Sequence, residues 1–230
     1  MSGHRSAEDV EAQHLAVLGP DLGPIYHALY NEIVWLHAKW LEYRKLYGHS
    51  ANRIDLLNGT AGFFFKVVQD VLLHDVLLDL SCLTGPMKSA GRPTLTLRRL
   101  PPAIPDPVLR ATVLQSVEDA RLACAFATEW RNRELAHRDL GLALSAGAAP
   151  LPGVSRQHVE TALLAIRTAF GKVSGHYFDS EVAFDRFVTG TGAEALVYHL
   201  AFAQRAEERQ EQRLLAGKAL PDDLEPIPEV

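Results

Sequence analysis

The stretch Trp130-Arg131-Asn132-Arg133-Glu134-Leu135-Ala136-His137-Arg138-Asp139-Leu140 combines three arginines, an amide, a histidine and two carboxylates. It follows a segment with helical periodicity that begins at Asp106-Pro107. The apolar stripe of that segment consists of Val113, Val117, Ala120, Cys124 and Ala127. A core-facing stripe that becomes polar at one end indicates a functional site at that end.

Helix geometry predicts which of these side chains share a face. At about 100° per residue, Arg133 and His137 lie within about 40° of each other, and Asn132 and Asp139 within about 20°. In a continuous helix Arg131 and His137 are separated by about 120°, part of which the long arginine side chain can bridge. One helix would therefore present a fixed cation, a titratable imidazole and an amide.

These groups suit the chemistry of phosphodiesters. Histidine can move a proton near neutral pH. Arginine binds a phosphate with a fork of N–H donors and stabilises the charge that builds in the transition state. Asn132 can hold either the phosphate or the imidazole. If a ribose hydroxyl of the substrate is the nucleophile, no metal is needed, so no cofactor is expected.

The same residues resemble the signature of the HEPN superfamily, in which an Arg precedes a His by six positions. With Ala136 and Asp139 included, the string is similar to the abortive-infection U-type (AbiU-like) branch of that superfamily. Further matching blocks lie upstream in the right order, and the resemblance runs from about Trp35 to Phe187. They are Tyr47-Gly48, Asp55-Leu56-Leu57-Asn58, Phe63-Phe64-Phe65, Asp75-Val76-Leu77-Leu78 and Leu95-Thr96-Leu97.

The resemblance implies an all-α helical bundle of HEPN type, with long antiparallel helices and short accessory helices. It implies a metal-independent endoribonuclease of a toxin–antitoxin or phage-defence system. Arg131 and His137 would be catalytic and Asn132 their polar helper. Arg133, Glu134, Arg138 and Asp139 would bind phosphate or support the site. Expected partners are RNA (transfer RNA or messenger RNA), a second copy of the chain through the motif face, and an antitoxin protein.

Two positions depart from the family pattern. Members of the branch often carry an Arg and an Asp in a Leu-Ser-Arg-Leu-Thr-Asp string, whereas this chain reads Leu80-Ser81-Cys82-Leu83-Thr84-Gly85. If that Arg and Asp brace the site in relatives, the site is altered here. Members silenced by a nucleotidyltransferase often carry a Tyr two residues after the His. Here that residue is Asp139, so we expect no adenylylation at the motif.

Three other readings stay open. The motif can be a solvated helix end, with Glu134 and Arg138 as an ordinary i,i+4 pair. It can belong to a non-catalytic HEPN-like module that binds RNA, a nucleotide or a protein. Glu-x-x-His occurs at Glu11/His14 and again at Glu134/His137, which resembles a metal-binding motif of helix bundles.

Composition limits the class of protein. The chain has 230 residues, of which 47% are hydrophobic and 22% charged, enough for a sizeable core. A net charge of −5 argues against a surface built for long nucleic-acid tracts, so RNA affinity should be modest and salt-sensitive. Two cysteines, Cys82 and Cys124, suggest a reducing compartment and are expected in the core. With no signal peptide or membrane span expected, the protein should be cytoplasmic, without membrane contact.

The chain is expected to comprise an N-terminal extension with a short helix (residues 1–22), one helical domain (23–216), and a flexible acidic, proline-rich tail (217–230). Expected helices cover Ala7–Leu18, Pro24–Tyr47, Ser50–Leu83, Pro107–Leu140, Ser155–Phe178 and Ala193–Ala216, with a short one at Thr94–Leu100. Gly59 and Gly62 favour a kink. The aromatic groups Phe63-Phe64-Phe65 and Trp35/Trp40 are expected in the core, and no strand is expected.

Overall fold

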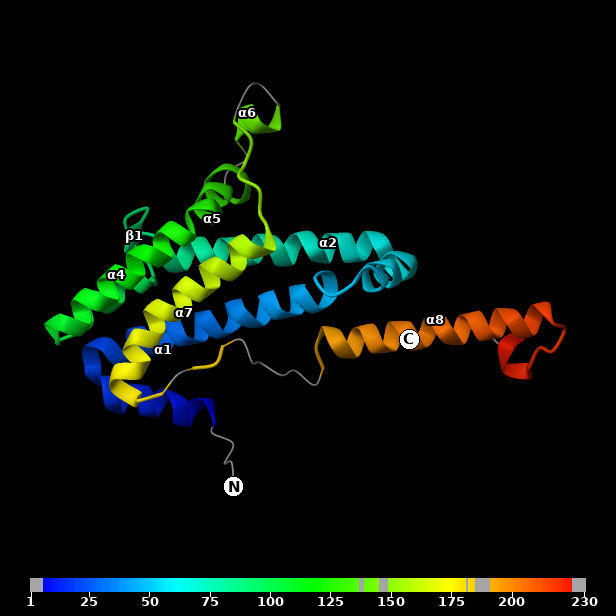
Figure 1. The fold of residues 1–230 in the computed structure, drawn as a ribbon, viewed down its shortest axis with the longest axis horizontal. Helices are drawn as coiled ribbons and strands as arrows, with labels where there is room; N and C mark the ends of the chain where they lie inside the picture. Colours follow the sequence, from blue (N-terminus) through cyan, green and yellow to red (C-terminus); the bar gives the residue numbers. More distant parts are fainter. Residues whose placement is uncertain (1–5, 137–138, 145–148, 181, 185–190, 225–230) are drawn as a thin grey trace. The chain divides into compact units, whose positions relative to one another are not determined.

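A computed structural model describes residues 6–136, 139–144, 149–180, 182–184 and 191–224. Helices make up almost all of its regular structure, so the expected all-α class is confirmed (Figure 1). The chain divides into two compact units: residues 1–41 with 72–187 (unit 1), and residues 42–71 with 188–230 (unit 2). Within the described ranges, no helix has both the length and the apolarity that a membrane crossing requires.

Helix α1 (Ala7–Tyr47) is interrupted at Gly19, where φ is 74°. Glycine adopts a positive φ without a Cβ clash, so the chain turns there, as the Gly19-Pro20 pair predicts. The helix restarts at Pro20 rather than at Pro24. Proline is tolerated at the start of a helix because the N–H it lacks would have no intrahelical partner there.

The helical segment on both sides of Gly19 packs into unit 1. Leu18 and Leu22 are buried, and so is His14, whose ring meets those of Tyr26 and Tyr30 at centroid distances of 4.9 and 5.1 Å. The segment expected as an extension therefore contributes side chains to the core.

Helix α2 (Ala51–Thr84) starts after Ser50, whose hydroxyl accepts the Arg53 amide at 3.3 Å. It is interrupted at Ala61 (φ −155°, ψ 62°), between the two glycines that favour a kink. Beyond this break, its unit 1 portion is tied to α1, where Lys39 Nζ donates to Asp75 at 2.5 Å.

A small antiparallel ribbon follows, formed by β1 (Lys88–Ser89) and β2 (Arg92–Pro93), and it corrects the expectation that the chain has no strands. The turn residues Ala90 and Gly91 both have positive φ, as a tight two-residue hairpin demands. Strands this short show no alternation of apolar and polar residues. The predicted short helix is present as η1 (Leu97–Arg99) and continues into α3 (Leu100–Ala103).

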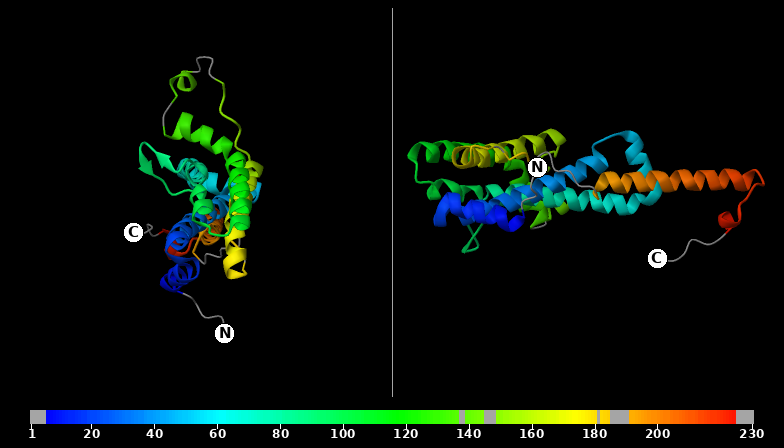
Figure 2. Two further views of the ribbon diagram at one scale, coloured as in Figure 1. Left: turned by 90° about the vertical axis from the view of Figure 1, so that its left-hand side faces the viewer. Right: turned by 90° about the horizontal axis from the view of Figure 1, so that it is seen from below.

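The core of unit 1 lies where α4 (Pro107–Ala123) and α7 (Arg156–Phe178) run side by side (Figures 1 and 2). The predicted stripe of Val113, Val117, Ala120, Cys124 and Ala127 is buried, and so is the stripe of α7 formed by Val159, Leu163, Ile166 and Phe170. Tyr26 of α1 stacks on Phe170 at 4.3 Å and shares a buried hydrogen bond of 2.9 Å with Ser174. These contacts join α1 to α7.

Unit 2 contains the last residues of α1 and the first part of α2, which together make up residues 42–71. It also contains helix α8 (Ala193–Leu215) and η3 (Pro221–Leu224). Arg53 forms a fork with Glu194 through distances of 3.1 and 3.0 Å. Arg213 donates to Asp223 at 2.8 Å, so the chain after Gly217 contains a short ordered turn. The rest of the expected tail, residues 225–230, lies outside the described residues.

Some aromatic and thiol side chains expected in the core are exposed. Phe63, Phe64 and Trp35 are 85%, 60% and 68% exposed, whereas Phe65 and Trp40 are buried. Each helical residue advances by about 100°, so three consecutive residues cannot all face one core. Cys82 is exposed as well, and only Cys124 is buried.

The His14–His27 pair predicts how acid changes the stability of unit 1. The two Nδ1 atoms lie 3.1 Å apart, so one ring donates to the other. Burial, and then the proximity of His27, lowers the pKa of His14 below its usual 6.5. In the unfolded chain His14 therefore binds a proton near pH 6.5, whereas in the folded chain it binds that proton only at lower pH. Stability from this group is complete above pH 6.5 and is lost as the pH falls below it.

We expect the free energy of unfolding to fall less between pH 7.5 and pH 5.5 in His14→Phe than in the wild type, as measured by urea denaturation. His176→Phe, on the exposed side of α7, is the matched control and should follow the wild type. Identical pH dependence in all three proteins would contradict a depressed pKa at His14.

Candidate functional site

The periodicity predicts one continuous helix over Pro107–Leu140. The structure corrects this prediction, because the polar cluster at residues 130–140 does not lie on one continuous helix. Helix α4 ends at Ala123, and Cys124 (φ −94°, ψ 6°) separates it from α5 (Ala125–Trp130). Residues Arg131–Leu135 (η2) then form a wider π-type turn, in which the Ala136 amide donates to the Arg131 carbonyl at 2.8 Å. The helix ends there, and Asp139 begins α6 (Leu140–Ala143), which protrudes from the rest of unit 1 (Figure 1).

The wide turn changes the expected geometry of the motif. A hydrogen bond to the fifth residue back means that each residue advances by less than 100°, so the separations calculated for an α-helix do not hold here. Such turns within helices are frequent at functional sites. His137 and Arg138, both predicted site residues, lie outside the described residues.

Arg131 and Asn132 stand next to each other on the wide turn. The Arg131 guanidinium donates to the Asn132 side-chain oxygen at 3.3 Å, and Asn132 is exposed. This is the only hydrogen bond of the Arg131 side chain within the described part of the chain. A cation and an amide are thus presented together at the surface, as a phosphate-binding site requires.

Arg133, in contrast, is engaged within the protein. Its guanidinium donates to Glu129 at 3.1 Å and to the Ala149 carbonyl at 2.6 Å, and it lies 3.7 Å from Asp139. The side chain is 19% exposed. The structure therefore brings together Arg133 and Asp139, two of the predicted supporting residues, and Glu134 is half-buried on the same turn.

Asp139 caps α6 by accepting the Leu142 amide at 2.9 Å. This hydrogen bond and the charge of Arg133 hold the pKa of Asp139 below its ordinary value. The carboxylate is therefore ionised at neutral pH. Trp130 anchors the other side of the motif, because its indole N–H donates to the Pro152 carbonyl at 2.8 Å.

Cys82, one of the two departures from the family pattern, lies in the electrostatic surroundings of Arg131. Although the Cys82 residue is exposed, neighbouring atoms desolvate its thiol and raise its pKa; the Arg131 charge opposes this shift, and Asp79 and Glu32 add to it. The charge of Arg131 therefore acts on this position of α2.

Sequence reasoning missed an ionic group on the neighbouring helices. Lys39 pairs with both Asp75 and Asp79. Burial alone would lower the pKa of Lys39, but its hydrogen bonds to the two carboxylates outweigh burial and raise the pKa. Burial also raises the pKa of Asp79, against the opposing charge of Lys39. The i,i+4 spacing of the two aspartates on α2 was the available signal, because it places both on one face.

Gly85, the second departure, ends the helix from which Cys82 projects. A Cβ at this position would lie 3.1 Å from the Ser81 carbonyl, tighter than most real contacts. The Thr96 hydroxyl shares its one proton between the Leu83 and Gly85 carbonyls, each 2.9 Å away. These contacts hold the end of α2.

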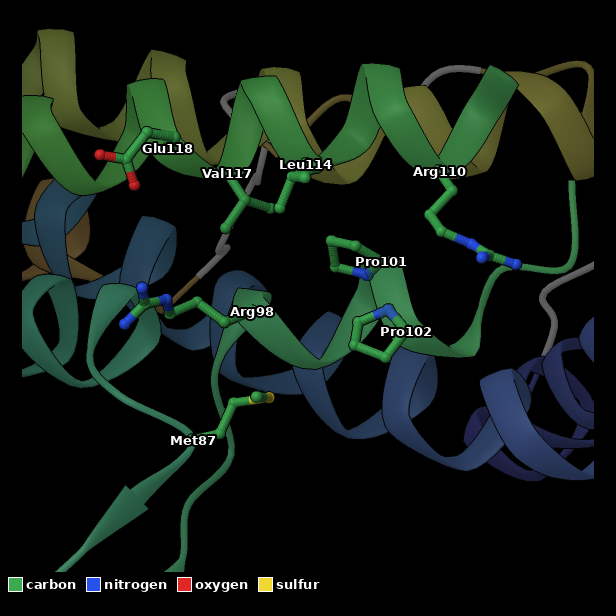
Figure 3. A pocket seen from close by; sticks show the side chains of 8 residues that line it. All are labelled: Met87, Arg98, Pro101, Pro102, Arg110, Leu114, Val117 and Glu118. Carbon is green, nitrogen blue, oxygen red and sulfur yellow. The ribbon is translucent and has the colours of Figure 1, made fainter. Parts of the chain in front are cut away.

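A groove with a cavity volume of about 510 Å³ opens between α3 and α4 (Figure 3), and its lining includes no residue of the motif. Met87, Pro101, Pro102, Leu114 and Val117 supply an apolar lining, with Arg98, Arg110 and Glu118 at its edges. Arg110 donates to the Ile104 and Pro105 carbonyls at 2.8 and 3.1 Å. The groove is mainly apolar and does not resemble a phosphate-binding surface.

In the described part of the chain, no three His, Cys, Asp or Glu side chains lie in an arrangement that could hold a metal ion. His14 of the first Glu-x-x-His motif pairs with His27, and Glu11 lies 3.9 Å from the same His27.

The electrostatic link between Arg131 and Cys82 predicts the reactivity of the thiol. A raised pKa lowers the thiolate fraction, so Cys82 should react with iodoacetamide at pH 8 more slowly than a free thiol. Replacing Arg131 by Gln removes the charge that favours the thiolate and should slow the reaction several-fold further. Burial raises the pKa of Cys124 to about 12, so this thiol should react only on unfolding.

Alkylation of Cys82 can be followed by mass spectrometry against pH. Arg121→Gln, which removes an arginine from α4, is the control and should leave the rate unchanged. Equal rates in the wild type and in Arg131→Gln would show that the guanidinium does not act on the thiol.

Comparison with known proteins places this geometry in a family. The family model described as HEPN AbiU2 matches residues 19–196, most of the chain. Searches of curated proteins and of solved structures found no match. The match spans every described motif residue and the helices that carry them, and it confirms the resemblance seen in the sequence. The chain therefore belongs to the AbiU2 family of HEPN proteins.

Proposed function

We propose that this protein is a metal-independent endoribonuclease that acts as a toxin or phage-defence effector. The observation that carries the proposal is the Arg131–Asn132 pair, which presents a guanidinium and an amide on a π-type turn at the surface. His137 follows Arg131 by six residues, the spacing of the family motif. Residues 131–137 thus contain the cation, the amide and the titratable group that phosphodiester cleavage needs.

The reaction is an internal transfer within the RNA. His137 acts as the general base or acid while a ribose 2′-hydroxyl attacks the adjacent phosphorus. The bond between the 2′-oxygen and phosphorus forms, and the bond from phosphorus to the 5′-oxygen of the next nucleotide breaks. The proton lost by the 2′-hydroxyl is balanced by the proton that the leaving 5′-oxygen gains. The products are a 2′,3′-cyclic phosphate and a 5′-hydroxyl end.

Arg131 stabilises the phosphate as negative charge builds on its oxygens. Asn132 accepts a hydrogen bond from Arg131 and so fixes the direction of the guanidinium. The amide side of Asn132 remains a donor toward the phosphate or the imidazole. The net charge of −5 gives no broad attraction for nucleic acid, so binding depends on this local cation and weakens with salt.

The wider biological setting belongs to the same proposal. A second copy of the chain would join the first through the motif face, and an antitoxin protein would restrain the nuclease until it is needed. The substrate would be transfer RNA or messenger RNA, which places the reaction in the cytoplasm.

A second candidate function is a non-catalytic module that binds RNA, a nucleotide or a protein through the same surface. Cys82 favours this alternative, because the residue beside Arg131 is a thiol of raised pKa rather than the arginine that relatives often carry. A site with one cation fewer holds the transition-state charge less well.

His137→Ala should abolish RNA cleavage and leave the fold intact. Purified wild-type protein and the variant are incubated with total RNA and with transfer RNA in EDTA, and the ends of the fragments are analysed. We expect cleavage by the wild type alone, with cyclic-phosphate ends. His176→Ala, an exposed histidine of α7, is the matched control and should cleave like the wild type. Unchanged cleavage by His137→Ala would exclude the mechanism.

Cys82→Arg should strengthen RNA binding when introduced into His137→Ala, which binds without cutting. The added cation beside Arg131 makes one further phosphate contact, so the salt dependence of binding should steepen by about one charge. Arg131→Gln should shift the slope by about the same amount in the opposite direction. Binding is measured by fluorescence anisotropy against salt concentration, with Cys82→Ser as the control. No change in slope with either variant would remove the surface around Arg131 as the RNA site.

A further inference from the structure

Arg133 joins three separate segments that surround the motif. Its guanidinium contacts Glu129 of α5, Asp139 at the start of α6, and the carbonyl of Ala149 in the segment that leads to α7. The three distances are 3.1, 3.7 and 2.6 Å. No other described side chain of the motif contacts all of these segments.

The charge of Arg133 is more than offset within the protein, because two carboxylates face one guanidinium. Two carboxylates and one carbonyl face its Nη1, Nε and Nη2 atoms, so every nitrogen of the guanidinium has a partner. The side chain is 19% exposed, and the pKa of Asp139 is held below its ordinary value. The two carboxylates leave this group with a net negative charge, which disfavours a phosphate. Arg131, in contrast, is hydrogen-bonded only to Asn132 among the described residues.

The backbone of Arg133 holds the same partner as its side chain. The Asp139 amide donates to the Arg133 carbonyl at 2.9 Å, while the Asp139 carboxylate faces the Arg133 guanidinium. Just before this, the Ala136 amide is bonded to the Arg131 carbonyl at 2.8 Å. In the sequence His137 lies between Ala136 and Asp139. The nearest described residue on each side of this histidine is therefore hydrogen-bonded to the wide turn.

We propose that Arg133 is a positioning residue that fixes the chain on both sides of His137 and does not bind the scissile phosphate. This inference rests on the proposed nuclease function and divides its two arginines between separate tasks. Arg131 binds the phosphate, and Arg133, with Glu129, Asp139 and Ala149, holds the chain that carries the histidine. A lysine cannot replace Arg133 in this task, because one ammonium group cannot reach three acceptors in a fixed plane.

The first experiment compares the kinetics of Arg133→Lys with those of the wild type on an RNA that the wild type cleaves. A misplaced histidine lowers kcat by about 10- to 100-fold while KM stays within about two-fold, because substrate binding is retained. A phosphate ligand would behave differently, since lysine keeps the charge and the loss would fall mainly on KM. Arg121→Lys is the matched control, because Arg121 also forks onto a glutamate of its own helix, away from the motif.

Asp139→Asn provides a second variant that leaves Arg133 in place. If the two residues act together, Asp139→Asn lowers kcat as Arg133→Lys does, and the double variant is no slower than the slower single variant. If Arg133 is a phosphate ligand, removing the facing carboxylate frees it, and Asp139→Asn binds RNA more tightly. That outcome, or a rise in KM with kcat unchanged in Arg133→Lys, would overturn the proposal.

Amide hydrogen exchange tests the positioning role without any cleavage. In Arg133→Gln the amides of Asp139 and Leu142 should exchange about ten-fold faster, while those of α7 stay protected. Glu129→Gln, which removes one exposed partner only, should show a smaller change. Unaltered exchange at Asp139 and Leu142 would exclude the positioning role. If the wild type cleaves no RNA, the nuclease proposal fails, and the exchange data still decide whether Arg133 holds this segment.

Discussion

Burial of one face of α7 holds unit 1 together. Val159, Leu163, Ile166 and Phe170 lie on this face, and α4 packs along it. Phe170 also stacks on Tyr26 of α1, whose hydroxyl bonds to Ser174 one turn further along. Apolar burial and aromatic stacking thus fix the helix that leads to the motif relative to the long first helix. The motif turn can depart from α-helical geometry because the stripe before it, which ends at Ala127, is already buried.

The departure itself separates the two arginines of the motif. On a regular helix, residues two apart point in nearly opposite directions, and the sequence does not tell which one is engaged. The π-type turn leaves Arg131 beside Asn132 at the surface and places Arg133 among two carboxylates and a carbonyl. Two residues of the same type therefore acquire different chemistry from the backbone that carries them. This difference supports a division between binding of phosphate and positioning of the histidine segment.

The surroundings of the site are more acidic than the motif alone suggests. Asp75, Asp79 and Glu32 lie on the neighbouring helices, and Lys39 neutralises only part of their charge. Burial raises the pKa of the Cys82 thiol, the charge of Arg131 opposes this shift, and Asp79 and Glu32 add to it. The charge of Arg131 is therefore opposed by the carboxylates of Asp79 and Glu32 where it acts on Cys82.

The sequence by itself determined the all-α class, the main helix boundaries and the family. The break at Gly19, the cap at Ser50 and the stripe from Val113 to Ala127 follow from local rules of backbone freedom, capping and periodicity. Tertiary structure decided which polar side chains meet. Periodicity assumes a regular helix, so it could not reveal the wide turn at Arg131–Leu135 or the α6 cap at Asp139. It could not show that Phe63 and Trp35 face outward, or that Lys39 pairs with aspartates of α2. The exposure of Phe63 and Trp35 and the pairing of Lys39 depend on contacts between residues far apart in the chain, and local pattern carries no information about such contacts.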